Sequence, residues 1–148
     1  MGTIRQAFQN AGLRHTRQRE AVFAALVATD AHPTAEELHE LVRQDEPGLS
    51  LATIYNSLEV LSEAGLCRRL PSNGGPIRFD ADLTEHVHVV LPDGRVLDVP
   101  EPLASELLKA LPAGLVQDIE AQTGIEMCGL GIQLVAFIRN EPGKNTDF

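Results

Sequence analysis

The sequence has few cysteines, no long apolar run and a shortage of basic residues, and each shortage excludes a class of protein. Its 148 residues include two cysteines, Cys67 and Cys128, and neither belongs to a CxxC pair. A disulfide framework and a thiolate zinc site are therefore excluded. No apolar stretch reaches the roughly 18 residues that a membrane-spanning helix needs. The formal net charge of −9 argues against a general nucleic-acid binder.

The basic residues are nevertheless concentrated in one part of the chain. Residues 1–80 carry eight basic and ten acidic side chains, whereas residues 81–148 carry four and eleven. Specific DNA binding requires a basic face and not a basic whole protein. The first part therefore remains a candidate for DNA binding.

The N-terminus MGTIRQAFQN contains no apolar signal core, and the isolated cysteines suit a compartment that keeps thiols reduced. We therefore expect a cytoplasmic protein that does not contact a membrane.

Four helices are predicted in the first 65 residues. They cover residues 3–11, 16–29, 34–42 and 50–64. Thr34 and Glu37 have the spacing of a capping box, with Leu38, Leu41 and Val42 as the buried stripe, and Ser50 caps the fourth helix. LCRRL and IRFD then predict two short strands around a turn rich in proline and glycine. Helices followed by a β-hairpin are typical of a winged helix, in which the last helix enters the major groove.

The remaining chain predicts a smaller α/β unit. HVHVVL and RVLDV form strands around Pro92-Asp93-Gly94, residues 102–111 and 112–124 form helices, and IEMC and IQLVAFIR form strands. The predicted fold class is thus α+β. A winged-helix DNA-binding domain (1–80), a hinge (81–85), an α/β dimerisation and metal-sensing domain (86–140) and a flexible tail (141–148) follow one another. The apolar strand IQLVAFI has little to cover it in so small a unit, which predicts a homodimer.

The segment HVHVVLPDGRVLDV carries the clearest chemical signal. Strand alternation places His86 and His88 on one face, with Val87 and Val89 on the other. Asp98 lies on the returning strand. Two imidazoles and one carboxylate around a hairpin predict part of a metal site.

Several segments together resemble the ferric uptake regulator (Fur) superfamily of bacterial metal-dependent repressors. They are GLRHTRQREAVFAAL, AHPTAEELHELV, SLATIYNSLEVLSEAGL, IRFD and HVH. Asn56 after Tyr55, and Asp80 rather than glutamate in IRFD, resemble the peroxide-sensing branch (PerR) more than the iron-uptake branch. The resemblance covers about residues 10–100 well and the last third more loosely.

The resemblance implies a regulatory metal with five ligands: His32, Asp80, His86, His88 and Asp98. The match at Asp98 requires a one-residue deletion in the turn. Nitrogen and oxygen donors suit Fe(II) and Mn(II), and also accept zinc. In the peroxide-sensing branch, bound iron leads to oxidation of the residues that match His32 and His86.

The sequence also departs from the family. The family usually carries a structural zinc held by two CxxC pairs, but this chain has Leu91 and Asp93 at the first pair and no cysteine at the second. A structural zinc held by four cysteines is therefore not expected. Arg17 replaces a proline that is common in the family.

The segment SLATIYNSLEVLSEAGL resembles the DNA-recognition helix of the family. Its outward residues, Ser50, Thr53, Tyr55 and Asn56, are candidates to read operator DNA. Arg17 and Arg19 lie at the start of the second helix and are candidates for phosphate contacts. Arg68, Arg69 and Arg78 on the wing are similar candidates.

Three alternatives remain beside the peroxide-sensing repressor. One is a Fur-type iron, manganese or zinc uptake regulator without peroxide sensing. Another is a winged-helix dimer whose metal site has decayed. The most distant is a non-haem iron enzyme, because two histidines and a carboxylate also describe such enzymes. The helices and the basic wing would then have no role, so we expect no enzymatic activity.

Overall fold

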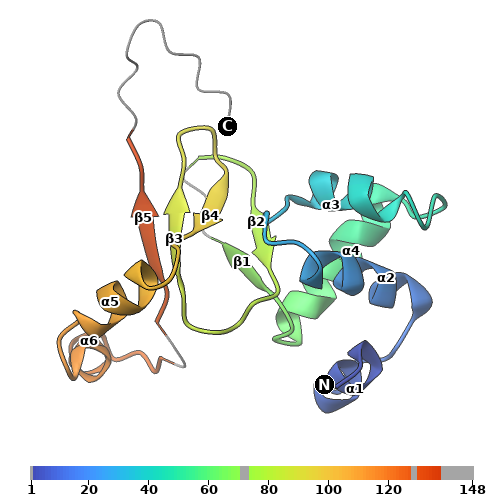
Figure 1. Cartoon of the computed structure of the whole chain (residues 1–148). Coiled ribbons are helices and arrows are strands. Elements are labelled where there is room, and N and C mark those ends of the chain that lie inside the picture. Colours follow the sequence, from blue (N-terminus) through green and yellow to red (C-terminus); the bar gives the residue numbers. More distant parts are fainter. Residues whose placement is uncertain (1, 71–73, 128–129, 138–148) are drawn as a thin grey trace, which may run out of the picture.

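The computed structural model describes residues 2–70, 74–127 and 130–137 and shows a mixed α+β fold in two parts (Figure 1). Four helices come first: α1 (Ile4–Asn10), α2 (Arg17–Val27), α3 (Ala35–Val42) and α4 (Leu51–Glu63). A hairpin of β1 (Arg68–Leu70) and β2 (Arg78–Asp80) follows. The second part contains β3 (Val87–Val90), β4 (Val96–Asp98), α5 (Leu103–Lys109), α6 (Leu115–Thr123) and β5 (Ile132–Val135). The predicted fold class is confirmed.

Each of the first four helices begins at a side-chain cap that the sequence provides. Thr3, Thr16, Thr34 and Ser50 accept hydrogen bonds from backbone N–H groups in the first turn of their helices. At α3 the reciprocal bond from the Thr34 N–H to Glu37 completes the predicted capping box. These bonds satisfy amides that the helix itself leaves without partners.

The first part has its own hydrophobic core between α1–α4 and the hairpin. Phe8, Leu38, Ile54 and Leu61 have no exposed surface, and Phe79 of β2 packs into the same cluster. Leu41 was predicted to be buried, but it is 43% exposed. Successive helical residues are about 100° apart, so the three steps from Leu38 to Leu41 amount to about 300°. Leu41 therefore lies roughly 60° around the helix from the buried Leu38.

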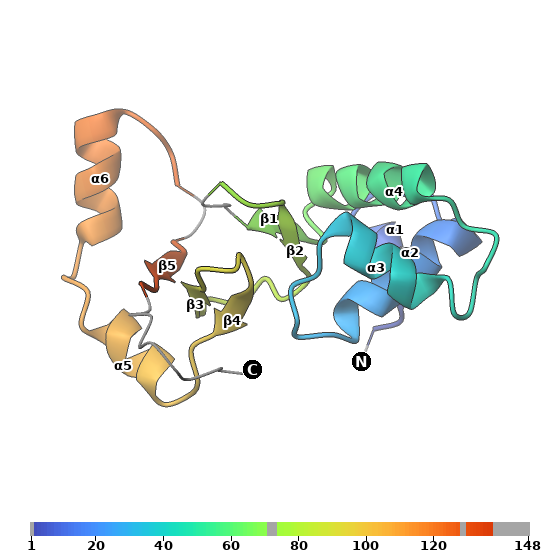
Figure 2. The ribbon, with the colours of Figure 1, turned by 90° about the horizontal axis from the view of Figure 1, so that it is seen from above.

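The second part is a three-stranded sheet in the order β4-β3-β5, with α5 and α6 beyond it (Figure 2). β3 and β4 are antiparallel, and their register pairs His88 with Asp98 and Val90 with Val96. β5 runs parallel to β3. IEMC was predicted to be a strand, but its residues 125–127 form no strand. Cys128 and the predicted tail lie outside the described residues.

The β1–β2 hairpin lies between the helices and the second sheet (Figure 2). Leu70 of β1 packs with Val90 and Val96 in a small apolar cluster, while Phe79 of β2 belongs to the helical core. Alternate residues of the hairpin thus face different parts of the molecule. Within the described ranges, no helix combines the length and the apolar character that crossing a membrane demands.

Candidate metal centre

The structure brings five predicted side chains together where the two parts meet. His32 lies in the loop before α3, Asp80 ends β2, and His86, His88 and Asp98 come from the β3–β4 hairpin and the residue before it. Donor atoms of His32, Asp80, His86 and His88 all lie within 4.8 Å of one another. Asp98 Oδ1 lies 3.1, 3.5 and 3.4 Å from Nε2 of His32, His86 and His88. Their role as ligands stays a prediction.

The two carboxylates flank the three imidazoles. Asp80 Oδ2 lies 3.7, 3.0 and 3.3 Å from the same three Nε2 atoms. If both oxygens lay on the same side of the plane through the three nitrogens, these distances would place them so close together that the two atoms would overlap. Asp80 and Asp98 therefore lie on opposite sides of that plane, and the five donors surround a common centre.

Strand register explains how Asp98 reaches the site. His88 and Asp98 are directly paired across the β3–β4 ladder, and paired residues point to the same face of a sheet. His86 precedes His88 by two positions, and their ring centroids are 4.3 Å apart. The hairpin thus supplies three donors from one face.

A backbone contact fixes the proton on His86. Its Nδ1 lies 2.8 Å from Thr84 O, and a carbonyl can only accept, so Nδ1 carries the hydrogen. In the neutral ring the Nε2 lone pair then faces the centre, as metal coordination requires. Arg68 Nη2 donates to the same carbonyl over 3.1 Å, so β1 also holds this loop.

Asp80 is buried and yet suited to remain ionised. Burial raises the pKa of its carboxyl, but hydrogen bonds from His88 and the Asp82 N–H, with the nearby His32 and His86, outweigh burial and lower that pKa. The Asp82 N–H donates to Oδ1 over 2.8 Å, which leaves Oδ2 to face the histidines. The carboxylate is therefore charged at neutral pH.

This donor set fits a divalent cation. His86 Nε2 and His88 Nε2 are 2.8 Å apart, so at most one of these two nitrogens carries a hydrogen and the other presents a lone pair. A divalent ion would neutralise both carboxylates and accept all the lone pairs. Three nitrogens and two oxygens without thiolate suit Fe(II), Mn(II) or Zn(II).

A small cavity of about 100 Å³ reaches the centre from outside. It is lined in part by His32, Asp80, Asp82 and Asp98, and the Asp98 side chain is 42% exposed. Small molecules can therefore approach the donors from this side.

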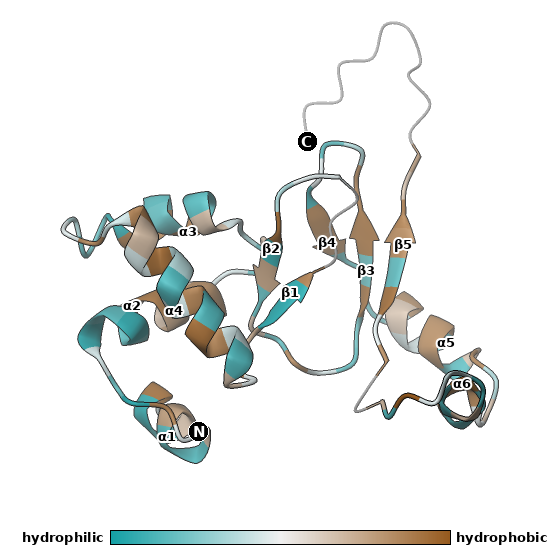
Figure 3. Ribbon diagram, turned by 180° about the vertical axis from the view of Figure 1, so that it is seen from behind, coloured by the Kyte–Doolittle hydropathy of each residue, from teal (hydrophilic) through white to brown (hydrophobic). Residues whose placement is uncertain are grey.

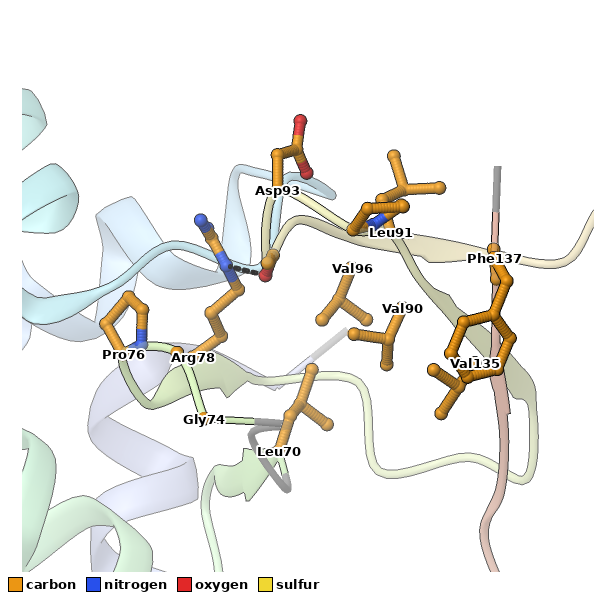
Figure 4. A pocket seen from close by; sticks show the side chains of 14 residues that line it. Leu70, Gly74, Pro76, Arg78, Val90, Leu91, Asp93, Val96, Val135 and Phe137 are labelled. Atoms are coloured by element: carbon orange, nitrogen blue, oxygen red, sulfur yellow. Dashed lines mark hydrogen bonds between the residues drawn. The ribbon is translucent and has the colours of Figure 1, made fainter. Parts of the chain in front are cut away.

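A larger cavity of about 390 Å³ lies away from the centre, between the wing and the second sheet (Figure 4). Leu70, Val90, Val96 and Val135 make much of its lining apolar. Arg78 also lines this cavity, but its guanidinium is already hydrogen-bonded to protein groups. The cavity therefore offers few groups that could bind a polar ligand.

The predicted DNA-reading residues lie in and before α4. Ser50, Tyr55 and Asn56 are exposed and Thr53 is half-buried. The Tyr55 hydroxyl donates to Glu36 over 2.5 Å, and this bond raises the pKa of the phenol. Ser50 accepts from the Thr53 N–H as the helix cap. A role in DNA recognition stays a prediction for all four.

The candidate phosphate contacts of α2 have protein partners in this structure. Arg17 is exposed and pairs with Glu46 over 2.7 Å. Arg19 Nη1 donates to the Arg14 carbonyl.

The prediction that Arg78 faces DNA is wrong. Arg78 is 7% exposed and contacts Glu37, His32 O and Gly94 O. This role was not predicted from the sequence, although strand alternation would have placed Arg78 on the same face as Asp80.

Comparison with known proteins identifies similar sequences and folds. The profile of the Ferric uptake regulator family matches residues 10–121. The peroxide-responsive repressor PerR of Staphylococcus saprophyticus is 36% identical over 102 residues, which is 68% of this chain and 69% of that protein. A PerR of Staphylococcus aureus is 33% identical over the same shares.

Solved structures resemble the whole architecture. The Vibrio cholerae ferric uptake regulator has a TM-score of 0.68 at 25% identity and covers 90% of this chain and 98% of its own. The regulator from Pseudomonas aeruginosa with manganese has a TM-score of 0.67 at 25% identity and covers 92% and 97%.

Proposed function

The chain belongs to the Ferric uptake regulator family, and from this premise we propose that it is a metal-dependent DNA-binding transcriptional repressor that senses peroxide. The observation that carries the proposal is the convergence of His32, Asp80, His86, His88 and Asp98 from two parts of the chain. A cation held by all five fixes the orientation of the helical part relative to the hairpin. The proposed role is regulation and not catalysis. The proposed location is the cytoplasm, where DNA is accessible.

We assign Fe(II) or Mn(II) to the regulatory site, with Zn(II) as a third metal that the donors accept. The similar Pseudomonas aeruginosa structure is described with manganese. A chain with two cysteines cannot supply a structural zinc site of four cysteines. The dimer therefore has to be held by packing.

The same proposal assigns a role to each part of the chain. Residues 1–80 form the DNA-binding domain, 81–85 the hinge and 86–140 the dimerisation and metal-sensing domain. α4 enters the major groove of double-stranded operator DNA with Ser50, Thr53, Tyr55 and Asn56, while Arg17 and Arg19 contact phosphates. Tyr55 and Arg17 exchange their partners Glu36 and Glu46 for DNA.

A homodimer suits the surface of the second part. β5 pairs with β3 on one side, and Leu134, Val135 and Phe137 are 43%, 44% and 90% exposed. Figure 3 shows the apolar character of β3–β5. Burying such a strand against a second copy removes apolar surface from water and spaces two α4 helices for a two-fold operator.

Peroxide sensing rests on the imidazoles of His32, which lines the small cavity, and of His86, whose Nε2 lies 3.0 Å from Asp80 Oδ2. Bound iron(II) supplies the redox chemistry that activates peroxide. The imidazole of His32 or His86 gains one oxygen atom at a ring carbon, the peroxide is reduced by two electrons, and its second oxygen leaves as water. An oxidised ring is a poorer ligand, so the five donors no longer hold the two parts together and DNA is released.

Iron-dependent oxidation of the ligand histidines is the first predicted result. With Fe(II) bound and stoichiometric peroxide added, we expect one added oxygen on peptides containing His32 or His86, measured by peptide mass spectrometry. A manganese-loaded sample should remain unmodified. Bound iron without ligand oxidation would contradict peroxide sensing and favour an iron, manganese or zinc uptake regulator. If iron did not bind at all, the site would be decayed or would belong to another metal.

A further inference from the structure

Arg78 forms a junction between three segments beside the metal centre. Its Nε donates to Gly94 O over 2.8 Å, the bond drawn in Figure 4. Its Nη1 donates to His32 O over 3.0 Å and to Glu37 Oε2 over 2.8 Å, and its Nη2 donates to Glu37 Oε1 over 3.3 Å. One guanidinium thus connects the β3–β4 turn, the loop of His32 and helix α3. A lysine has no planar fork with which to make these bonds.

His32 needs such a connection because its backbone is strained. Its φ of 48° lies in the left-handed region, where non-glycine residues are uncommon. Arg78 holds its carbonyl, and the Phe79 N–H holds the next carbonyl, Pro33 O, over 3.0 Å. The Nδ1 atom of His32 has no hydrogen-bond partner in the described part of the chain. The backbone contacts therefore direct the His32 ring toward Asp80 and Asp98.

Glu37 extends the junction toward the DNA-recognition helix. The same carboxylate that binds Arg78 also accepts the Thr34 N–H over 3.0 Å and so completes the capping box of α3. The adjacent Glu36 accepts the Tyr55 hydroxyl of α4. Arg78 is therefore linked to His32 on one side and, through α3, to α4 on the other.

We propose that Arg78 is a positioning residue that holds His32 in its ligand conformation and connects the metal centre, through Glu37, to helices α3 and α4. The inference rests on the proposed metal site. The new element is that the affinity of the site for its metal depends on the Arg78 side chain, which does not contact the metal. Two matched pairs of variants separate this role from a general charge effect.

The first pair is Arg78→Gln and Arg95→Gln, each removing one cation. Arg95 belongs to the β3–β4 turn that Arg78 of β2 contacts, but it pairs with the exposed Asp93. We expect Arg78→Gln to lower Mn(II) affinity about 10- to 100-fold, the usual effect of losing an outer partner of a ligand. Arg95→Gln should remain within about twofold, as expected for an exposed pair. Mn(II) titration followed by electron paramagnetic resonance of the free ion measures both, with circular dichroism to confirm folding.

The second pair, Glu37→Gln and Glu40→Gln, serves if Arg78→Gln does not fold. Glutamine is accepted at the third position of a capping box, so Glu37→Gln removes the charge while keeping the cap. We expect at least about a threefold loss of Mn(II) affinity, because charge-assisted bonds are roughly twice as strong as neutral ones. Glu40 pairs with Arg43 on the surface, so Glu40→Gln should have no effect.

A His32→Ala background tests whether Arg78 acts through His32. If it does, adding Arg78→Gln to His32→Ala should produce little further loss of Mn(II) affinity, whereas independent effects would multiply. Multiplying effects, or wild-type affinity in folded Arg78→Gln and Glu37→Gln, would overturn the inference. If the wild-type protein itself fails to bind Mn(II), the proposed function fails instead.

Discussion

Replacing His88 by alanine is expected to lower Mn(II) affinity by at least about 100-fold, because a lost ligand should cost no less than a lost outer partner of a ligand. His88 is 6% exposed, and its Nε2 lies 3.3 Å from Asp80, 3.4 Å from Asp98 and 2.8 Å from His86. It therefore contacts both carboxylates and a neighbouring imidazole. Titration with Mn(II), followed by electron paramagnetic resonance of the free ion, measures the loss.

His15→Ala is the matched control for this prediction. His15 belongs to the first part of the chain, and its ring bonds to Glu20. His15→Ala deletes an imidazole, as His88→Ala does, but it should leave the Mn(II) affinity unchanged. Equal affinities of His88→Ala and wild type would show that the five side chains do not form the metal site.

Saturating Mn(II) is expected to raise the midpoint of thermal unfolding by about 8–16 °C. A ligand that binds only the folded state contributes about 4 kcal/mol at a concentration of 1,000 Kd. For a chain of about 150 residues, each kcal/mol corresponds to roughly 2–4 °C. The unfolded chain cannot hold Mn(II) with five donors, since they come from residues 32 to 98. Calorimetry with Mn(II) and with chelator measures the difference.

The comparison for this shift is His88→Ala under the same conditions. At the same Mn(II) concentration its midpoint should move by no more than about a third of the wild-type shift, because a roughly 100-fold weaker site is filled at only about 10 times its Kd. A wild-type shift no larger than that of His88→Ala would mean that the stabilisation arises elsewhere.

The features that the sequence predicts well depend on local geometry. Thr34, Glu37 and Ser50 cap their helices as predicted, because caps involve residues only three positions apart. Alternation placed His88 of β3 and His86, the residue before β3, on one face. The resemblance to the family supplied His32 and Asp80, which lie far from this hairpin in sequence and which no local pattern would have joined to it.

The features that the sequence did not predict depend on tertiary contacts. Arg78, with Arg68 and Arg69, was a candidate for phosphate contacts because it lies in the basic hairpin after the helices, and no local pattern indicated that it is buried. Its burial is compensated by Glu37 and by two carbonyls that only the folded chain brings together. The left-handed backbone of His32 is likewise set by these contacts and not by residue preference.

Metal-dependent DNA binding tests the central claim most directly. The measurement is the affinity of the protein, with Mn(II) and after chelation, for duplexes selected from a random pool in the presence of Mn(II). We predict a selected sequence whose affinity falls at least about tenfold on chelation, the scale of a typical allosteric coupling. His88→Ala should not show this dependence. Equal affinity with and without metal, or the same metal dependence in His88→Ala, would contradict the account.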